Sequence, residues 1–296
     1  MIDLKLLIQA GVQFGHQTWR WNPNMAPYIW GKKNGVHLID VSKTAFQLEK
    51  AAQFLEGVAT EGKQVLWVGT KTSAKETVEA IGRNFKCPSV AHRWVGGTLT
   101  NNSQVKKSIT KLLHLQDVIE KATVGAYTKK ELGSIQKLVD RLEKNVGGIK
   151  NMTWPVGALI VVDIRKEHSA VREAIAAGVP VVAIVDTNND PSLVDYVIPA
   201  NDDVARSVKV ILDYLAEAVE RGLKVAKETK KAAQTTAEVP ADRMISQMVE
   251  QAFGLEGASA EAKKAGAGNK PGAQRRGPVR GGSSRPGGNA PRRPKE

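Results

Sequence analysis

The stretch ALIVVDIRKEHSAVREAIAAGVPVVAIVD, residues 158–186, decides the fold class. Its first six residues and its last seven, 180–186, are apolar up to a closing aspartate, whereas 166–178 has helical spacing and ends in glycine. Strands that are apolar throughout need cover on both faces, and two of them joined through a helix run parallel. The stretch therefore predicts a βαβ unit within a parallel α/β sheet.

The same alternation of strands and helices extends to both sides of this stretch. Helices are expected at 41–62, 75–85 and 202–222, and strands at 35–40, 64–70, 88–94 and 195–201. Strands and helices in this order form a parallel sheet with helices on both faces. We therefore expect one α/β domain built from residues 1–102 and 150–225.

Residues 103–149 interrupt the alternation with two helical stripes. Side chains recur in steps of three and four at Val105, Ile109, Leu112, Gln116 and Ile119, and again at Leu132, Ile135, Val139, Leu142 and Val146. This heptad-like spacing predicts an antiparallel coiled-coil hairpin with its bend at 124–130. Because each helix has one apolar stripe and is otherwise charged, the hairpin is expected to protrude from the domain.

The last part of the chain has a different composition. Residues 226–256 are expected to form a partly helical linker, with a short amphipathic segment at 241–253. Gly, Ala, Pro, Arg and Lys dominate 257–296, where Val279 is the one large apolar residue after position 260. Such a segment buries too little apolar surface to fold alone, so a disordered basic tail is expected.

The charge balance favours an anionic partner. The chain has 43 Lys and Arg against 30 Asp and Glu, a net charge of +13, which suits binding to nucleic acid. Ten of these basic residues and two of the acidic ones lie in 261–296, so the tail carries +8. The single cysteine, Cys87, excludes an internal disulfide and suits a reducing cytoplasm. No apolar run reaches the length of a bilayer span, and residues 1–13 lack the pattern of a signal or transit peptide.

Three segments combine cations with aromatic or hydrogen-bonding side chains. FGHQTWRWNPNMAPYIW at 14–30 and RWVGGTLTNN at 93–102 can stack on unpaired bases and bind phosphates, and two lysines mark the hairpin bend. The structural alternative is that the tryptophans seal the sheet, the glycines make a tight turn and the lysines are solvated. The candidate contact residues are His16, Trp19, Arg20, Trp21, Asn22, Tyr28, Lys32, Lys33, Arg93, Trp94, Thr98, Asn101, Asn102, Lys129 and Lys130.

Enzyme-like patterns are weaker. WVGTKTSAKET at 67–77 follows a strand but lacks the first glycine of a phosphate loop, and a turn capped by Thr72 or Ser73 explains it. Five carboxylates are expected near the carboxyl ends of strands, where Mg²⁺ can bind: Asp163, Asp186, Asp190, Asp202 and Asp203. Helix capping accounts for most of them, since Asp190 precedes Pro191 and Asn201 with Asp202 precedes a long helix.

The histidines and Cys87 are not spaced as zinc ligands, so a zinc site is not expected. No G-x-S-x-G motif or acid pair at catalytic spacing appears either, so we expect no metal, no cofactor and no small-molecule substrate. Two alternatives to a nucleic-acid-binding structural protein remain open. One is a magnesium-dependent phosphotransferase or hydrolase that uses Asp163, Asp186 and Asp190. The other is a nucleic-acid chaperone that acts through its tail.

Long motifs follow one another in a characteristic order. They are FGHQTWRWNPNMAPYIWGKKNGVHLID, VGTK, RWVGGTLTN, LEKNVGGIKNM, AVREA, DTNNDP and IPANDDVARSV. Over about residues 1–225 the chain resembles the bacterial small-subunit ribosomal protein two family. It departs from the family at Asn102, where an aromatic residue is usual, at Arg20, where a basic pair is common, and in the tail, which the family does not share.

The resemblance implies a flavodoxin-like three-layer domain with a protruding hairpin and no catalytic activity. It also implies a cytoplasmic, ribosome-bound protein that contacts 16S ribosomal RNA near the junction of head and body. Its other implied partners are small-subunit proteins, among them ribosomal protein one, which it helps to seat; no membrane is implied. The motif positions carried over are His16, Trp21, Asn22, Pro23, Arg93, Trp94, Gly96, Gly97, Thr98, Asn101, Lys129, Lys130, Gly147 and Gly148.

Overall fold

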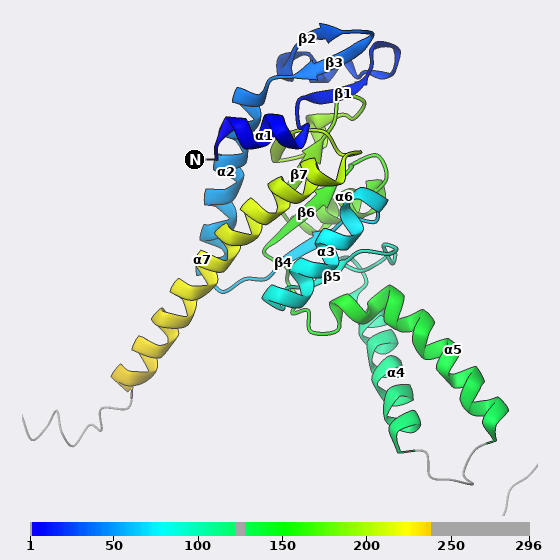
Figure 1. Ribbon diagram of the computed structural model, residues 1–296. Coiled ribbons are helices and arrows are strands. Elements are labelled where there is room, and N and C mark those ends of the chain that lie inside the picture. Colours follow the sequence, from blue (N-terminus) through cyan, green and yellow to red (C-terminus); the bar gives the residue numbers. More distant parts are fainter. Residues whose placement is uncertain (1, 122–127, 238–296) are drawn as a thin grey trace, which may run out of the picture. The chain divides into compact units, whose positions relative to one another are not determined.

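The computed structural model describes residues 2–121 and 128–237 (Figure 1). The hairpin bend expected at 124–130 is described only from residue 128 onward, and the tail expected at 257–296 lies outside the described residues. So does the amphipathic segment expected at 241–253. No helix in 2–121 or 128–237 is long and apolar enough to cross a membrane.

Five parallel strands form the central sheet, in the order β5-β4-β6-β7-β8. They are β4 (Val65–Val68), β5 (Ser89–Val90), β6 (Ala158–Val162), β7 (Val181–Val185) and β8 (Tyr196–Pro199). Counted from β4, this is the 2-1-3-4-5 order of flavodoxin-like sheets. The parallel α/β sheet predicted from the continuous apolar strands is confirmed.

Helices cover both faces of this sheet. They are α1 (Leu4–Ala10), α2 (Val41–Thr60), α3 (Thr72–Phe85), α6 (His168–Ala177) and α7 (Ala205–Ala237). Buried strand side chains alternate between two cores: Trp67 and Ile160 pack with α1, α2, α3 and α7, whereas Leu66 and Leu159 pack with α6 and the base of the hairpin. The strands are apolar throughout because each face of the sheet is covered.

The hairpin consists of α4 (Asn102–Glu120) and α5 (Lys129–Val146), followed by the short helix η3 (Gly147–Ile149). Ile109 and Leu112 of α4 are buried in the same core as Val139 and Val146 of α5. Thr128 begins α5 with a capping box, in which its side chain and that of Glu131 bind each other's backbone N–H. Two packed helices are therefore confirmed, and their coiled-coil character stays a prediction.

A small antiparallel sheet precedes the domain, and the sequence indicated only its last strand. It contains β1 (Phe14–Gln17), β2 (Ile29–Lys33) and β3 (Val36–Ile39), with β3 in the middle. Between β1 and β2 lie the 3₁₀ helices η1 (Thr18–Arg20) and η2 (Pro23–Tyr28). Pro23 begins η2, where its missing N–H is not needed, so the prolines shape the connection and leave the strands intact.

The structure differs from expectation at the end of α7, in the length of β5 and at the cap of α3. Helix α7 continues past Gly222 because this glycine packs against α2, where a Cβ would lie 2.7 Å from Ala59 Cβ. The strand expected at 88–94 contains only two residues, since the chain leaves the sheet to form the RWVGG loop. Neither Thr72 nor Ser73 caps α3; the cap residue is Lys71, and the Ser73 hydroxyl donates to the Asp202 carbonyl at 2.6 Å.

Candidate functional site

Three tryptophans are exposed on the antiparallel sheet and its connection. Trp30 of β2 is 76% exposed and Trp19 of η1 is 71% exposed, whereas Trp21 is 38% exposed and tilts against the His37 ring. The Arg20 guanidinium lies 4.5 Å from the centre of the Trp19 ring. Large aromatic side chains left in water beside cations are typical of a binding surface. The idea that these tryptophans seal the domain is therefore wrong for Trp19 and Trp30.

Of the remaining candidates in this segment, some lie at the surface and others hold the connection between β1 and β2 in place. Lys32 and Lys33 are exposed on β2 beside Trp30. Asn22 caps η2 by accepting from Asn24 N at 2.9 Å, and its own N–H donates to Thr187 O at 2.8 Å. Tyr28 is half-buried against the core. Asn22 and Tyr28 thus hold the connection in place, while the lysines face solvent.

The RWVGGTLTN loop is built around the carboxylate of Glu173 on α6. Glu173 Oε1 accepts from Trp94 Nε1 at 2.9 Å and from Gly97 N at 2.8 Å, and Oε2 accepts from Leu99 N at 3.1 Å. Trp94 is 8% exposed and Thr98 is 1% exposed, so both lie inside the protein. Their burial favours the structural interpretation of these two candidates.

Other candidates of this loop remain at the surface. Arg93 and Asn101 are exposed, and Asn102 is half-buried at the start of α4. The loop therefore offers a cation and amides to a partner, whereas its tryptophan ring is turned inward.

Replacing Glu173 with glutamine should lower the free energy of unfolding by about 1.5–3 kcal/mol, because one N–H donor would then face an amide NH₂ instead of a carboxylate oxygen. Urea unfolding followed by tryptophan fluorescence measures this change. The exposed Glu76→Gln in α3 is the matched control and should leave stability unchanged. Equal stability of the two variants would show that Glu173 does not hold the loop.

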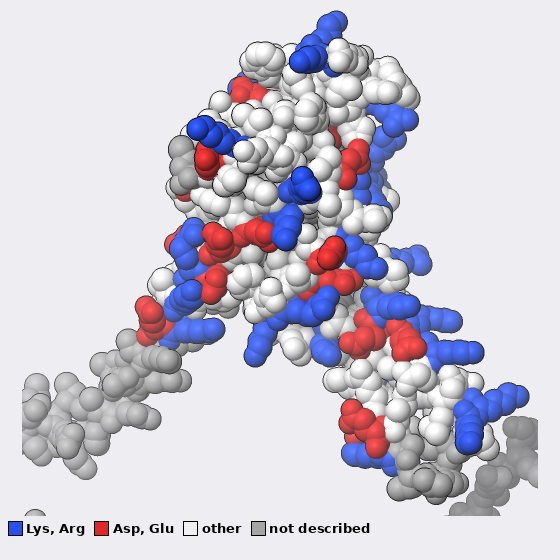
Figure 2. Space-filling view, viewed as in Figure 1, with Lys and Arg blue, Asp and Glu red and all other residues white. Residues whose placement is uncertain are grey.

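Lys129 and Lys130 are exposed in the first turn of α5. Cations at a helix N-terminus oppose the helix dipole, so helix stability does not explain them. Figure 2 shows further Lys and Arg side chains along the hairpin. These lysines therefore remain candidates for a phosphate contact.

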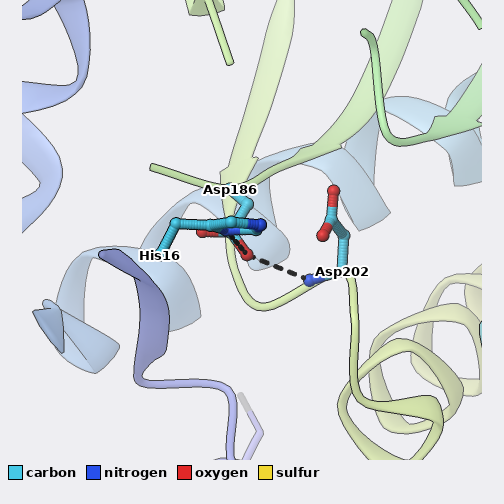
Figure 3. Close-up of side chains that lie close together, drawn as sticks. All are labelled: His16, Asp186 and Asp202. Carbon is cyan, nitrogen blue, oxygen red and sulfur yellow. Dashed lines mark hydrogen bonds and ion pairs between the residues drawn. The ribbon is translucent and has the colours of Figure 1, made fainter. Parts of the chain in front are cut away.

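A buried cluster of charges lies at the carboxyl ends of the parallel strands. His16 of β1 places Nδ1 3.2 Å from Asp186 Oδ2 and Nε2 3.3 Å from Asp203 Oδ2. Asp186 and Asp202 are fully buried, and Asp202 Oδ2 has no hydrogen-bond partner. Ligand atoms of His16, Asp186 and Asp202 all lie within 4.8 Å of one another, so within residues 2–121 and 128–237 these three could hold a metal ion (Figure 3).

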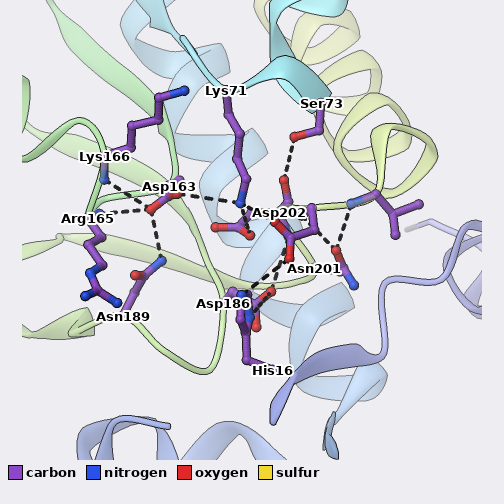
Figure 4. Close-up of polar contacts among 12 residues, drawn as sticks. His16, Lys71, Ser73, Asp163, Arg165, Lys166, Asp186, Asn189, Asn201 and Asp202 are labelled. Carbon is purple, nitrogen blue, oxygen red and sulfur yellow. Dashed lines mark hydrogen bonds and ion pairs between the residues drawn. The ribbon is translucent and has the colours of Figure 1, made fainter. Parts of the chain in front are cut away.

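Lys71 supplies a cation to this cluster from within the chain. Its Nζ lies 2.7 Å from Asp202 Oδ1, 2.6 Å from Asp203 Oδ1 and 3.6 Å from Asp163 Oδ2 (Figure 4). Asp190 stays apart and caps the short helix η4 (Pro191–Leu193). Capping thus accounts for Asp190, as expected. The capping prediction is wrong for Asp202, because Asn201 Oδ1 accepts from the N–H groups of Asp203 and Val204 that precede α7.

The cluster shifts the pKa values of its members. Burial and the neighbouring Asp186 raise the pKa of Asp202 to about 7, although Lys71 opposes the shift. Burial would lower the pKa of Lys71, but its hydrogen bonds to Asp202 and Asp203 outweigh burial and hold that pKa well above 10.5. The Asp186 carboxylate raises the pKa of His16 above 6.5 against the effect of burial.

In the stretch that resembles a phosphate loop, residues 67–77, the polar groups of Thr70 and Lys71 bind carboxylates of the same chain. Thr70 donates both its backbone N–H, at 3.1 Å, and its hydroxyl to Glu167 Oε1. Lys71, the cation that would reach a nucleotide, binds aspartates instead. Sequence reasoning missed this arrangement because Lys71 and Asp202 are 131 residues apart. The geometry explains VGTK as a structural motif.

The comparison with known families agrees with this picture. A family model described as Ribosomal protein S2 matches residues 7–222, which include both sheets and the hairpin. Members of this family are structural proteins of the small ribosomal subunit. The chain belongs to the ribosomal protein S2 family.

Proposed function

We propose that this chain binds 16S ribosomal RNA near the junction of head and body and helps to seat ribosomal protein one on the cytoplasmic ribosome. The family match over residues 7–222 is the observation that carries the proposal. The α/β domain of residues 1–102 and 150–225 and a coiled-coil hairpin at 103–149 form two docking parts. Residues 226–256 link them to the basic tail 257–296, and no catalysis or cofactor is involved.

Positioning is the proposed mechanism. Exposed cations fix the orientation of the protein on folded RNA through phosphates, and exposed aromatic rings stack on bases or on a protein neighbour. The surface residues assigned to these contacts are Trp19, Arg20, Trp21, Trp30, Lys32, Lys33, Arg93, Asn101, Lys129 and Lys130. The tail adds a salt-sensitive attraction that does not depend on sequence.

Sedimentation of the endogenous protein through sucrose gradients at moderate and at high salt tests the proposal. We expect the protein to travel with small subunits under both conditions, because contacts of the folded domain add to those of the charged tail. A protein that stays at the top of both gradients would overturn the assignment.

Replacing Trp19 and Trp30 with alanine should weaken incorporation into small subunits about tenfold or more, since base–aromatic stacking contributes roughly 1–3 kcal/mol per base. Both rings are largely exposed, so the stability of the free protein should stay within about 0.5 kcal/mol of the wild type. Incorporation is measured as the sedimenting fraction in competition with wild-type protein. Phe46→Ala, which removes another exposed ring on α2, is the control.

Two further measurements on the same variant identify the partner of the rings. Binding to isolated 16S RNA falls if they stack on bases, and retention of ribosomal protein one falls if they contact that protein. Wild-type incorporation of the double variant would contradict the assignment of these rings to the docking surface.

A further inference from the structure

A second, concave basic surface lies away from the exposed tryptophans. It is a hollow of about 620 Å³ between the end of α3, the edge strand β5 and the end of α5 with η3. Its charged lining consists of Lys75, Arg83, Lys86, Lys144 and Lys150 with His92, opposed by Glu79 and Glu143. Figure 2 shows Lys and Arg side chains around the carboxyl end of α3 and the base of the hairpin. We call this surface the basic hollow.

Its positive charge is only partly neutralised. Arg83 lies 3.5 Å from Glu79, and Lys150 lies 3.7 Å from Glu143. These pairs are exposed, so they are weak and can rearrange. In the described part of the chain, Lys75, Lys86 and Lys144 have no carboxylate within ion-pair distance. Five cations against two carboxylates leave the hollow with +3, without counting His92.

Lys86 stands where the backbone favours glycine. It ends α3 in the left-handed conformation with φ +54°. A side chain is strained in this conformation, and glycine is the usual residue at such a helix end. The Lys86 side chain is exposed, so packing does not compensate for the strain. What lysine adds at this position is its charge, and that charge faces the hollow.

Close backbone contacts fix the walls of the hollow. A Cβ on Gly148 of η3 would overlap the Ser89 carbonyl oxygen, and a Cβ on Gly82 of α3 would overlap the Ser89 hydroxyl. Both elements therefore approach the edge strand as closely as the chain allows. The backbone that carries the cations is therefore already in place, and binding has to order only their side chains.

We propose that the basic hollow binds the phosphate backbone of folded ribosomal RNA. The inference rests on the proposed function and assigns it a surface where the LEKNVGGIKNM motif of residues 142–152 meets α3 and β5, away from the contact residues chosen from the sequence. RNA backbone fits better than a free nucleotide, because the lining holds no Trp, Tyr or Phe on which a base could stack.

The test uses the full chain and isolated 16S RNA, with affinity measured between 50 and 300 mM salt. Lys86→Gly removes the cation and the backbone strain together, so its melting temperature should equal or exceed that of the wild type. Its affinity should fall about three- to tenfold, and the slope of log K against log salt should flatten by roughly 0.7–0.9 per lost phosphate contact. A triple variant that adds Lys75→Ala and Lys144→Ala should flatten the slope by about two to three times as much.

Two controls separate strain from charge. Asn34→Gly relieves the same left-handed conformation, with φ +51°, in the turn between β2 and β3 without changing charge. Lys209→Ala removes an exposed cation from α7. Both should bind RNA like the wild type.

The outcomes distinguish the two proposals. If the wild type binds RNA and the triple variant keeps its slope, the basic hollow is not an RNA site, although the proposed function stands. If the wild type itself does not bind 16S RNA, the proposed function fails first. Loss of binding to poly-glutamate with unchanged RNA binding would assign the hollow to an acidic protein segment. If the hollow binds one anion that millimolar inorganic phosphate displaces, and the salt slope of RNA binding is unchanged in the triple variant, the hollow is a site for free phosphate. Each of the last two results would overturn the inference.

Discussion

Lys71→Met is expected to lower the free energy of unfolding by about 3–5 kcal/mol at pH 8.5, since removing one partner of a buried ion pair leaves the other charge uncompensated. Asp202 is fully buried, and Lys71 Nζ is the cation that lies 2.7 Å from its Oδ1. Asp203 and Asp163 share the same ammonium. Without Lys71, these carboxylates face one another at the end of the sheet.

The loss of stability in Lys71→Met should be larger at high pH than at low pH. The pKa of Asp202 is about 7 in the folded protein against 3.8 for an ordinary aspartate, so the folded state binds more protons between these values. Stability therefore falls as pH rises through this window, and the penalty is complete above it. At pH 5.5 Asp202 is largely protonated even with Lys71 present, so Lys71→Met leaves no buried Asp202 charge uncompensated there and loses less stability.

Lys71 itself does not create this dependence. Its folded pKa is raised, so its contribution is complete below 10.5 and is lost only when pH rises through the higher folded value. It is therefore constant between pH 5.5 and 8.5. Urea unfolding at pH 5.5, 7.0 and 8.5 measures the difference, and Lys71→Met with Asp202→Asn should recover much of the loss at pH 8.5. A loss of equal size at all three pH values would contradict the account.

Gly222→Ala should destabilise the protein by about 1–3 kcal/mol, the range for overpacking a well-filled interior. In the interior of an ordinary helix the same substitution has the opposite effect on stability, because alanine there is more stable than glycine by roughly 0.5–1 kcal/mol. The reason is that α7 crosses α2 at this glycine, where an added Cβ would overlap the Glu56 carbonyl oxygen and lie 2.7 Å from Ala59 Cβ.

Gly57→Ala is the matched control for this prediction. Gly57 lies in the interior of α2, and a Cβ there would meet no atom within 4 Å. This variant should gain about 0.5–1 kcal/mol. Thermal and urea unfolding of the two variants give the comparison. The same sign of change in both would show that the two helices separate freely at Gly222.

The parallel sheet could be predicted because its signal is local. Each strand of 158–186 is apolar over consecutive residues, and the intervening helix carries its own apolar stripe and glycine stop. The antiparallel sheet could not, since its strands contain only four or five residues and prolines lie between two of them. Short strands give too few alternations to separate from a loop.

The candidate site was predictable only in part. Trp19, Arg20 and the lysines of β2 could be chosen from composition, because exposed aromatic and basic residues suit RNA. Trp30 is not among those candidates, and only its exposure in the structure adds it. The interior position of Trp94 depends on Glu173, which is 79 residues away. The charged cluster depends on pairings across more than a hundred residues, such as that of His16 with Asp186. The position of the aspartates after parallel strands places them at one edge of the sheet, but the local sequence does not indicate His16 and Lys71 as their partners.

The internal cation at Lys71 has a thermodynamic consequence for assembly. Since the chain supplies its own counter-charge at the edge where doubly wound sheets commonly hold ligands, its α/β domain is complete before any partner arrives. Association then adds the burial of an interface and no folding of the domain. The heat-capacity change that the α/β domain contributes on joining the subunit should therefore scale with its interface area alone, without the large negative excess that accompanies coupled folding.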